Sequence, residues 1–255
     1  MPLIIAADNL NILNAAVAQA LNSLDPLPLQ ELARRCEQAG AGLIDINPGF
    51  LPPRRHDRMA FMVESVQQVT NLRLILDSPD ARVLARVLAV ANQPPILNAC
   101  TLEPNKLREI LPLAARHRTD LVLLLLDARS LPAARLEGKI TLALELRAHA
   151  LAAGLTDDQL IFDPVLPNLT WPDAWPRVGE VIKAVRLLHG DELWGEPART
   201  MAGLSNLRSG LRHNYPVRVE EAALALLAGA GLSLALIDVL QPGLMETVRV
   251  INQAG

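Results

Sequence analysis

Acidic and amide side chains recur along the chain, each at or just after the end of a short apolar segment. The spacing averages about 33 residues, and the residues are Asp8, Asp45, Asp77, Asn98, Asp127, Asp163, Asn206 and Asp238. Carboxylates and amides form paired hydrogen bonds with adjacent ring N–H and amino groups of a flat, nitrogen-rich heterocycle. Each charge-assisted bond contributes about 1.5–3 kcal/mol. The pattern therefore predicts a site for a pterin-like or purine-like ligand.

The same inventory argues against other chemistry. The chain's lysines, Lys106, Lys139 and Lys183, all fall in helical patterns, so we expect none at a strand end to form a Schiff base. The five histidines are scattered, and Cys36 and Cys100 lack the spacing of a zinc site. We therefore expect no metal site.

Short β-type segments alternate with longer amphipathic ones along the chain. We predict strands at residues 3–7, 41–46, 72–76, 95–98, 120–126, 159–162, 199–204 and 232–237. We predict helices at Leu29–Ala39, Asp57–Val69, Asp80–Ala91, Pro104–His117, Pro132–Ala153, Asp173–Leu188, Arg218–Ala228 and Gly243–Asn252. Asp80 and Asp173 stand at expected N-caps, and Gly40, Gly154 and Gly190 follow helix ends.

Eight strand–helix units in 255 residues predict an α/β protein, a (β/α)8 TIM barrel that forms a single domain over residues 1–255. An open doubly wound sheet is the competing architecture. It normally has a Gly-rich first turn, and Ala6-Ala7-Asp8-Asn9 is unlike one. In a barrel the active site lies at the C-terminal ends of the strands, where the polar residues are expected to gather.

Composition narrows the function classes. A net charge of −3 and 3% aromatic residues argue against a dedicated nucleic-acid binder. No apolar run approaches the roughly 20 residues of a membrane-spanning helix, and the N-terminus lacks a signal-peptide pattern. Two cysteines cannot make a disulfide scaffold. We therefore expect a cytoplasmic enzyme with no nucleic-acid or membrane partner.

Five segments resemble the strand ends of the pterin-binding barrel superfamily. They are Leu43–Gly49, Leu76–Ser78, Leu97–Ala99, Phe162–Pro164 and Gly203–Asn206. More narrowly, they resemble methyltetrahydrofolate:corrinoid methyltransferases, such as the one that serves the corrinoid/iron-sulfur protein. Each segment alone is a weak signal, but all five occur in the family's order within residues 3–252.

The resemblance implies a homodimeric barrel of one-carbon metabolism that binds 5-methyltetrahydrofolate in its C-terminal mouth. It implies transfer of the N5-methyl group to Co(I) of a corrinoid (cobalamin), or the reverse transfer. An Asp-x-His-x-x-Gly cobalamin motif is missing from the sequence, so the corrinoid must be carried by a partner protein. The direction, the pathway and the choice between tetrahydrofolate and tetrahydromethanopterin stay open.

Site residues follow from the resemblance by position. Asp77, Asn98 and Asp163 match the residues that bind the pterin, and Asn206 matches the catalytic asparagine that contacts N5. An asparagine can accept or donate a hydrogen bond, so it can follow N5 through the protonation that methyl transfer needs. The remaining substrate-binding candidates are Asp45, Asn47, Asn11 and Ser205.

The first strand departs from the family pattern. It carries Ala6-Ala7-Asp8-Asn9-Leu10-Asn11 where the family has a Gly-Glu-Arg-Ile-Asn-like run, which leaves open a non-catalytic folate-binding subunit. The other alternative is a dihydropteroate-synthase-like pterin enzyme. Its Ser-x-x-Arg-x-His pattern after the last strand is missing, because that strand is followed by Asp238-Val239-Leu240-Gln241.

Several residues also have a structural interpretation. Asp8, Asp127 and Asp238 fit helix caps or turns, Asp127 above all. The loop residues Arg208, Arg212 and His213 fit a folate tail, a partner contact or a solvated loop. For Arg54, Arg55, His56 and Arg58 a surface charge run is favoured over a ligand contact. Packing against the barrel or a dimer interface is expected for Trp171, Trp175 and Trp194.

Overall fold

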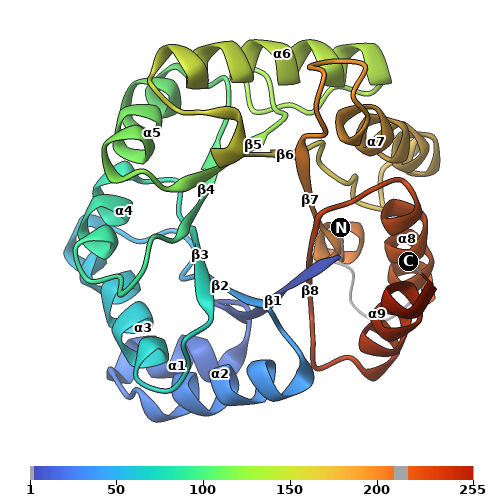
Figure 1. Cartoon of the computed structure of the whole chain (residues 1–255). Helices are drawn as coiled ribbons and strands as arrows, with labels where there is room; N and C mark the ends of the chain where they lie inside the picture. Colours follow the sequence, from blue (N-terminus) through green and yellow to red (C-terminus); the bar gives the residue numbers. More distant parts are fainter. Residues whose placement is uncertain (1–2, 210–217, 255) are drawn as a thin grey trace.

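The computed structural model describes residues 3–209 and 218–254. Eight parallel strands pair in chain order and close into a barrel, because β1 also pairs with β8 (Figure 1). The strands are β1 (Ile4–Asn11), β2 (Leu43–Asn47), β3 (Arg73–Asp77), β4 (Ile96–Cys100), β5 (Asp120–Leu124), β6 (Leu160–Asp163), β7 (Arg199–Gly203) and β8 (Leu234–Ile237). The predicted (β/α)8 TIM barrel is confirmed, as a single domain.

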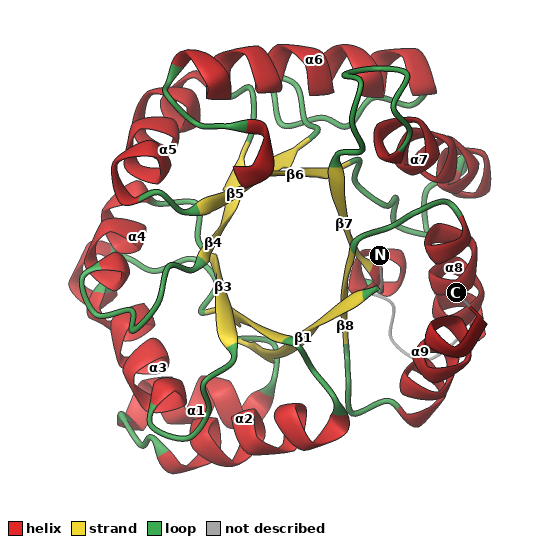
Figure 2. Cartoon of the chain, viewed as in Figure 1, coloured by secondary structure: helices red, strands yellow, loops and turns green. Residues whose placement is uncertain are grey.

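Helices form a ring outside the strands (Figure 2). They are α1 (Ala15–Ser23), α2 (Leu27–Ala39), α3 (Asp57–Gln67), α4 (Ala81–Leu88), α5 (Pro104–His117), α6 (Leu136–Ala152), α7 (Ala174–His189), α8 (Arg218–Gly229) and α9 (Pro242–Ala254). Three short 3-10 helices complete the described chain: η1 (Pro53–Arg55), η2 (Asp157–Gln159) and η3 (Leu204–Arg208). Among the described residues, no helix combines the length and apolarity needed to span a membrane.

Helix α1 was not expected from the sequence. Asn14 caps it by accepting a hydrogen bond from the backbone N–H of Ala16 at 3.0 Å. Val17, Ala20 and Leu21 are buried, at the three- and four-residue spacing of a helix that packs on one side. The asparagine followed by these spaced apolar residues is the signal that sequence reasoning overlooked.

The other helix ends partly match the predicted caps. Asp80 accepts from the backbone N–H of Arg82 at 2.8 Å, and Gly40 and Gly154 adopt positive φ values of 102° and 94°. Asp173 makes no capping bond and instead accepts from Arg177 Nε at 2.7 Å. Gly190 follows α7 in an extended conformation, so it needs no special backbone freedom.

The barrel interior is layered because alternate residues of each strand point inward. Its middle is a separate apolar cluster, distinct from the larger core between strands and helices. The cluster contains Ala6, Leu43, Ile75, Ile96, Ala99, Val122, Ile161, Met201, Leu234 and Leu236. Two residues earlier on three strands stand Arg73, Asp120 and Arg199. The inward-facing positions that come after the apolar cluster along the strands carry the acids and amides.

Strand β1 is longer than predicted and continues to Asn11. Its register with β2 shifts between Ala7 and Leu10, as at a β-bulge. An unbroken strand alternates its side chains between faces, whereas here the consecutive residues Asp8 and Asn9 both line the barrel mouth. The bulge therefore brings a second polar side chain to the site.

Candidate functional site

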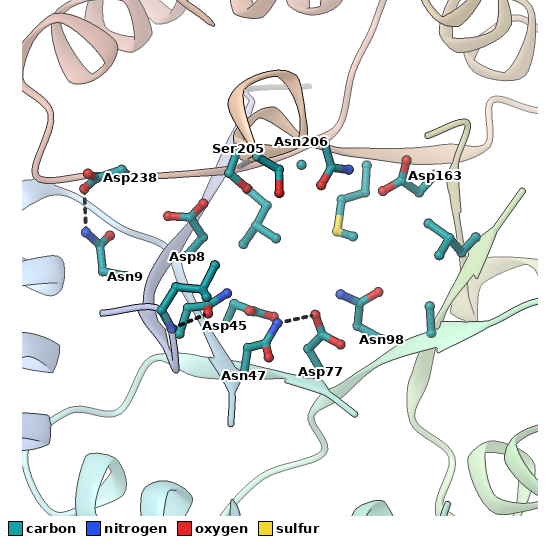
Figure 3. Close-up of a pocket in the computed structure, with 18 of the residues that line it drawn as sticks. Asp8, Asn9, Asp45, Asn47, Asp77, Asn98, Asp163, Ser205, Asn206 and Asp238 are labelled. Atoms are coloured by element: carbon teal, nitrogen blue, oxygen red, sulfur yellow. Dashed lines mark hydrogen bonds between the residues drawn. The ribbon is translucent and has the colours of Figure 1, made fainter. Parts of the chain in front are cut away.

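A cavity of about 670 Å³ opens at the C-terminal mouth of the barrel (Figure 3). This volume lies within the range of small-molecule sites, about 300–1,000 Å³. The eight substrate-binding candidates all line it: Asn11, Asp45, Asn47, Asp77, Asn98, Asp163, Ser205 and Asn206. They come from β1, β2, β3, β4, β6 and η3. The structure thus brings the eight together, while their roles in binding and catalysis remain predictions.

Two carboxylates and an amide form one side of the cavity. Asn47 Nδ2 donates to Asp77 Oδ2 at 2.8 Å, and Asn47 Oδ1 accepts from the Gly49 N–H at 2.9 Å, so both amide ends of Asn47 are held. Asp45 is 1% exposed, and its Oδ1 has no hydrogen-bond partner within the described part of the chain. A buried acceptor without a partner is costly, and a ligand N–H group would satisfy it.

Burial changes the ionisation of this pair. It raises the pKa of Asp45 well above the ordinary value, and the nearby charge of Asp77 adds to the effect. Burial also raises the pKa of Asp77 to about 6, with Lys106 opposing the shift. At neutral pH Asp77 is therefore mostly ionised, whereas burial and the charge of Asp77 both favour the protonated form of Asp45. Asp77 thus offers a ligand a charged acceptor.

Asp163 lies across the cavity and is 3% exposed. Its Oδ1 accepts from the backbone N–H of Val165 at 2.8 Å, which leaves Oδ2 available to a ligand. Burial raises the pKa of Asp163 to about 6, and the Val165 hydrogen bond and Lys139 partly offset the increase. Asp163 is consequently ionised at neutral pH.

Asp8 lies in the cavity beside Ser205, so its interpretation as a helix cap or turn residue was wrong. Burial raises the pKa of Asp8 to about 6, a hydrogen bond with Ser205 lowers it, and the charge of Asp238 raises it again. The sequence signal was the strand period, because Asp8 stands two residues after the inward-facing Ala6. Asp8 is thus a weak acid within the site.

Asp238 and Asp127 are both turn residues, in different surroundings. Asp238 Oδ1 accepts from the Leu240 N–H at 3.0 Å and from Asn9 Nδ2, and it lines the cavity. Asp127 Oδ1 accepts from the N–H groups of Arg129 and Leu131 at 2.9 Å each, outside the cavity lining. The turn interpretation of Asp127 is confirmed.

Two cations line the mouth, and one of them was not expected. Lys106 lies in the first turn of α5, as the helical pattern predicted, and it reaches the mouth because the N-terminus of α5 follows the end of β4. Arg208 donates from Nε and Nη2 to the buried Glu220 at 2.5 and 2.9 Å. Arg208 is therefore held by an acid and is not a solvated loop residue. Arg212 and His213 lie outside the described residues.

The basic cluster after β2, for which a surface charge run was expected, contains both exposed and buried residues. Arg54 and Arg55 are exposed, whereas His56 is buried with its Nε2 3.6 Å from Asp80 Oδ2. A surface charge run is thus wrong for His56, which lies between two helix starts. Trp194 stacks on Phe162 with ring centroids 5.0 Å apart, as expected for a packing residue.

Trp171 and Trp175 are among the exposed large apolar residues. Trp171 carries the guanidinium of Arg177 over its ring at 5.3 Å. Among the described residues, no group of three or more His, Cys, Asp and Glu side chains is arranged to hold a metal ion. Burial raises the pKa of Cys36 and of Cys100 to about 12, so neither is a thiolate at neutral pH.

Known proteins resemble this chain in family, in sequence and in fold. The family described as "Pterin binding enzyme" matches residues 10–237. A methylcorrinoid:tetrahydrofolate methyltransferase of Eubacterium limosum is 26% identical over 212 residues, which is 82% of this chain and 76% of the relative.

Two solved structures share the fold. The dihydropteroate synthase of Vibrio fischeri superposes with a TM-score of 0.72 at 18% identity over 99% of this chain and 93% of its own. That of Yersinia pestis does so with a TM-score of 0.70 at 21% identity over 99% and 92%. The family match spans most of the barrel, and the resemblance seen in the strand ends is confirmed. The chain belongs to the pterin-binding enzyme family.

Proposed function

We propose that this protein is a methyltransferase that moves the N5-methyl group between 5-methyltetrahydrofolate, or a related tetrahydropterin, and the cobalt of a corrinoid. The corrinoid would be carried by a partner protein. The observation that carries the proposal is the buried ring of acids and amides in the barrel mouth, with the unpartnered Oδ1 of Asp45 within it. The methylcorrinoid:tetrahydrofolate methyltransferase relative supports the choice of reaction.

The binding roles follow from the donors and acceptors of the ring. Ionised Asp77 and Asp163 accept from the amino-pyrimidine edge of the pterin, and Asn98 between them supplies both a donor and an acceptor. Burial raises the pKa of Asp45 well above its ordinary value, and its unpartnered Oδ1 accepts a ring N–H. Asn47 holds Asp77 in position by its 2.8 Å hydrogen bond.

The catalytic roles concern N5, because a tertiary amine nitrogen leaves poorly without a proton. Asn206 follows N5 through protonation by presenting either its carbonyl or its amino group. Burial raises the pKa of Asp8 beside Ser205 to about 6, so its minor protonated fraction at neutral pH supplies the proton to N5. The C–N bond then breaks with its electron pair on N5, which the proton has prepared as an N–H group. The corrinoid, when docked, supplies the cobalt that accepts the methyl group.

A condensing reaction of the dihydropteroate synthase type has weaker support. It needs cations for a pterin diphosphate. Among the described cavity residues the cations are Lys106 and Arg208, and Arg208 is held by Glu220. The structural neighbours of that type are below 25% identity and share only the fold. Product formation from a pterin diphosphate and an arylamine would favour this alternative.

The assembly is also part of the proposal. We propose that residues 1–255 form one pterin-binding domain and that two copies associate, as the resemblance to the methyltransferases implies. Light scattering at micromolar concentration measures the mass directly. A monomeric mass would remove the dimer from the proposal without affecting the chemistry.

Calorimetric titration with 5-methyltetrahydrofolate tests the binding site. We expect micromolar affinity in the parent protein and a loss of about tenfold or more in Asp163→Asn, because a charge-assisted hydrogen bond becomes a neutral one. Asp127→Asn is the matched control, since the same change is made in a turn outside the cavity. No binding of either 5-methyltetrahydrofolate or its tetrahydromethanopterin counterpart by the parent protein would overturn the proposal.

Free cob(I)alamin then serves as the methyl acceptor under anaerobic conditions. Methyl transfer that requires Asn206 supports the methyltransferase. Tight folate binding with no transfer, either to free cob(I)alamin or to cobalamin-bound partner proteins, would identify a non-catalytic folate-binding subunit instead.

A further inference from the structure

Lys139 is buried in a way that the proposed function does not explain. It lies in the first turn of α6 and is 1% exposed, although lysine is almost never fully buried without a partner. Its Nζ donates to the backbone carbonyl of Pro164 at 2.6 Å. No carboxylate lies within 4.0 Å of this ammonium in the described part of the chain. Within the described residues, its hydrogen-bond acceptor is therefore the carbonyl of the residue directly after Asp163.

The chain that follows Asp163 is strained. Val165 has a φ of 62°, a left-handed conformation that β-branched residues rarely adopt. This conformation lets the Val165 N–H reach back to Asp163 Oδ1 at 2.8 Å, so the strained turn sets the direction of the carboxylate. Such a conformation persists only when surrounding contacts enforce it. The Lys139 bond to Pro164, in the middle of this turn, is one of those contacts.

The charges around Lys139 single out Asp163. From α7, Arg177 opposes the charge of Lys139 and Glu180 favours it. Both oxygens of Glu180 are already engaged, at 2.7 Å each, by the Leu136 N–H and by Lys183 Nζ. On β6, Asp163 has only the Val165 N–H as its partner among the described residues. Asp163 is therefore the carboxylate that most needs the charge of Lys139.

We propose that Lys139 is a positioning residue that holds the Pro164 carbonyl, fixes the Asp163–Val165 turn and keeps the Asp163 carboxylate ionised toward the cavity. Lys139 does not touch the ligand. It acts from behind the strand, and its charge offsets the burial of Asp163. The raised pKa of Asp163, about 6, already includes the opposing effect of Lys139. Burial lowers the pKa of Lys139 itself to about 8, so it is charged at neutral pH.

The first test uses the ligand-free protein. Carboxyl ¹³C NMR follows the titration of Asp163, with the resonance assigned by its loss in Asp163→Asn. Lys139→Met removes the charge and the donor, and Lys139→Gln keeps a donor without the charge. We expect the midpoint of Asp163 to rise by at least about one pH unit in both variants. Lys183→Met, an exposed lysine in α7, is the charge-matched control and should leave the midpoint unchanged.

The second test measures affinity for 5-methyltetrahydrofolate against pH, and here the inference rests on the proposed function. In the parent protein affinity falls as pH drops through about 6, because Asp163 takes up a proton. In Lys139→Met that fall should begin about one unit higher, with about threefold weaker binding at pH 6.5, about tenfold weaker binding below pH 5.5 and convergence with the parent above pH 8. A merely structural defect would weaken binding equally at every pH.

The outcomes separate the two proposals. If the parent protein binds neither 5-methyltetrahydrofolate nor its tetrahydromethanopterin counterpart, the proposed function fails, and the NMR titration still decides the role of Lys139. An unchanged Asp163 midpoint in a folded Lys139 variant overturns the inference. If neither variant folds, the reciprocal measurement decides: ¹⁵N NMR of Lys139 should show its midpoint below about 8 in Asp163→Asn, because coupled charges act on each other equally. An unchanged lysine midpoint would overturn the inference just as firmly.

Discussion

The two ends of the barrel are built on the same strands but handle charge in opposite ways. At the N-terminal end, Arg73 Nη1 and Arg199 Nη1 both donate to Asp120 Oδ2 at 2.9 Å. At the C-terminal mouth, several carboxylates lie close together, and the cation Arg208 is held by Glu220. Burial raises the pKa of the mouth residues Asp8, Asp77 and Asp163 to about 6.

The difference separates stability from function. The N-terminal end pairs its charges internally, with Asp120 between two arginines, so it contributes to folding. The mouth holds carboxylates that are poorly compensated, and this costs stability in the ligand-free protein. Groups with pKa values shifted by burial in a cavity mark functional sites, which is the arrangement found here. Four substitutions test this contrast.

The largest effect is expected at the N-terminal end. Asp120→Asn removes the charge that separates Arg73 and Arg199 and leaves two partly buried guanidinium groups facing each other. We expect the free energy of unfolding to fall by about 3 kcal/mol, measured by urea denaturation. Folate affinity should stay within about twofold of the parent protein. A large loss of affinity in a folded variant would contradict the separation of the two ends.

The next effect concerns turnover at the mouth. Asn206→Ala should lower methyl transfer to cob(I)alamin about 100-fold at saturating folate, because the group that follows N5 through protonation is lost. Rapid-mixing absorbance of the cobalt species measures the rate. Stability should change little, since Asn206 lies at the cavity surface in η3, and folate affinity should fall by less than the transfer rate. An unchanged rate would remove Asn206 from the catalytic role.

The third prediction is a gain in the free energy of unfolding, whereas the first is a loss. Asp77 has a pKa raised to about 6, so the folded protein binds more protons than the unfolded chain between about pH 4 and 6. Stability therefore falls as pH rises through that window and stays lower above it. Asp77→Asn should raise the free energy of unfolding at pH 7.5 by about 2 kcal/mol and flatten this pH dependence. Folate affinity should fall in the same variant. Denaturation at pH 4.5 and 7.5 decides, and a destabilised variant at pH 7.5 would contradict the account.

The smallest effect lies just behind the rim. Asp80 caps α4, and its hydrogen bond with the Arg82 side chain lowers the pKa of Asp80 to about 2. Asp80→Ala should cost about 1 kcal/mol through the lost cap and leave folate affinity unchanged. This contribution is present above pH 4 and is lost as pH falls toward 2, the reverse of Asp77. Thermal melts at pH 3 and 7 measure it, and a loss of affinity would extend the site beyond the cavity lining.

Much of the fold was predictable because strand–helix alternation is a local pattern. The eight strands and eight of the helices fall where the apolar periods place them, within a few residues at most ends. The misses have local causes. Helix α1 is short and rich in alanine, and the bulge at Asp8 hides the true end of β1.

The candidate site, like the fold, was predictable only in part. The sequence by itself determined which side chains face the mouth, because a period of two residues sends Asp45 and Asn47, or Ile75 and Asp77, to the same face of a strand.

Only the tertiary structure decided which of those groups compensate one another. Asn9 meets Asp238 from 229 residues away, Arg208 is held by Glu220, and Lys139 reaches the turn after Asp163 from the neighbouring helix. Ionisation follows burial and the charges nearby, and both arise only when distant segments pack together. The strand pattern thus determined the ring of acids and amides, and the packing of the barrel determined how far the pKa of each acid is raised.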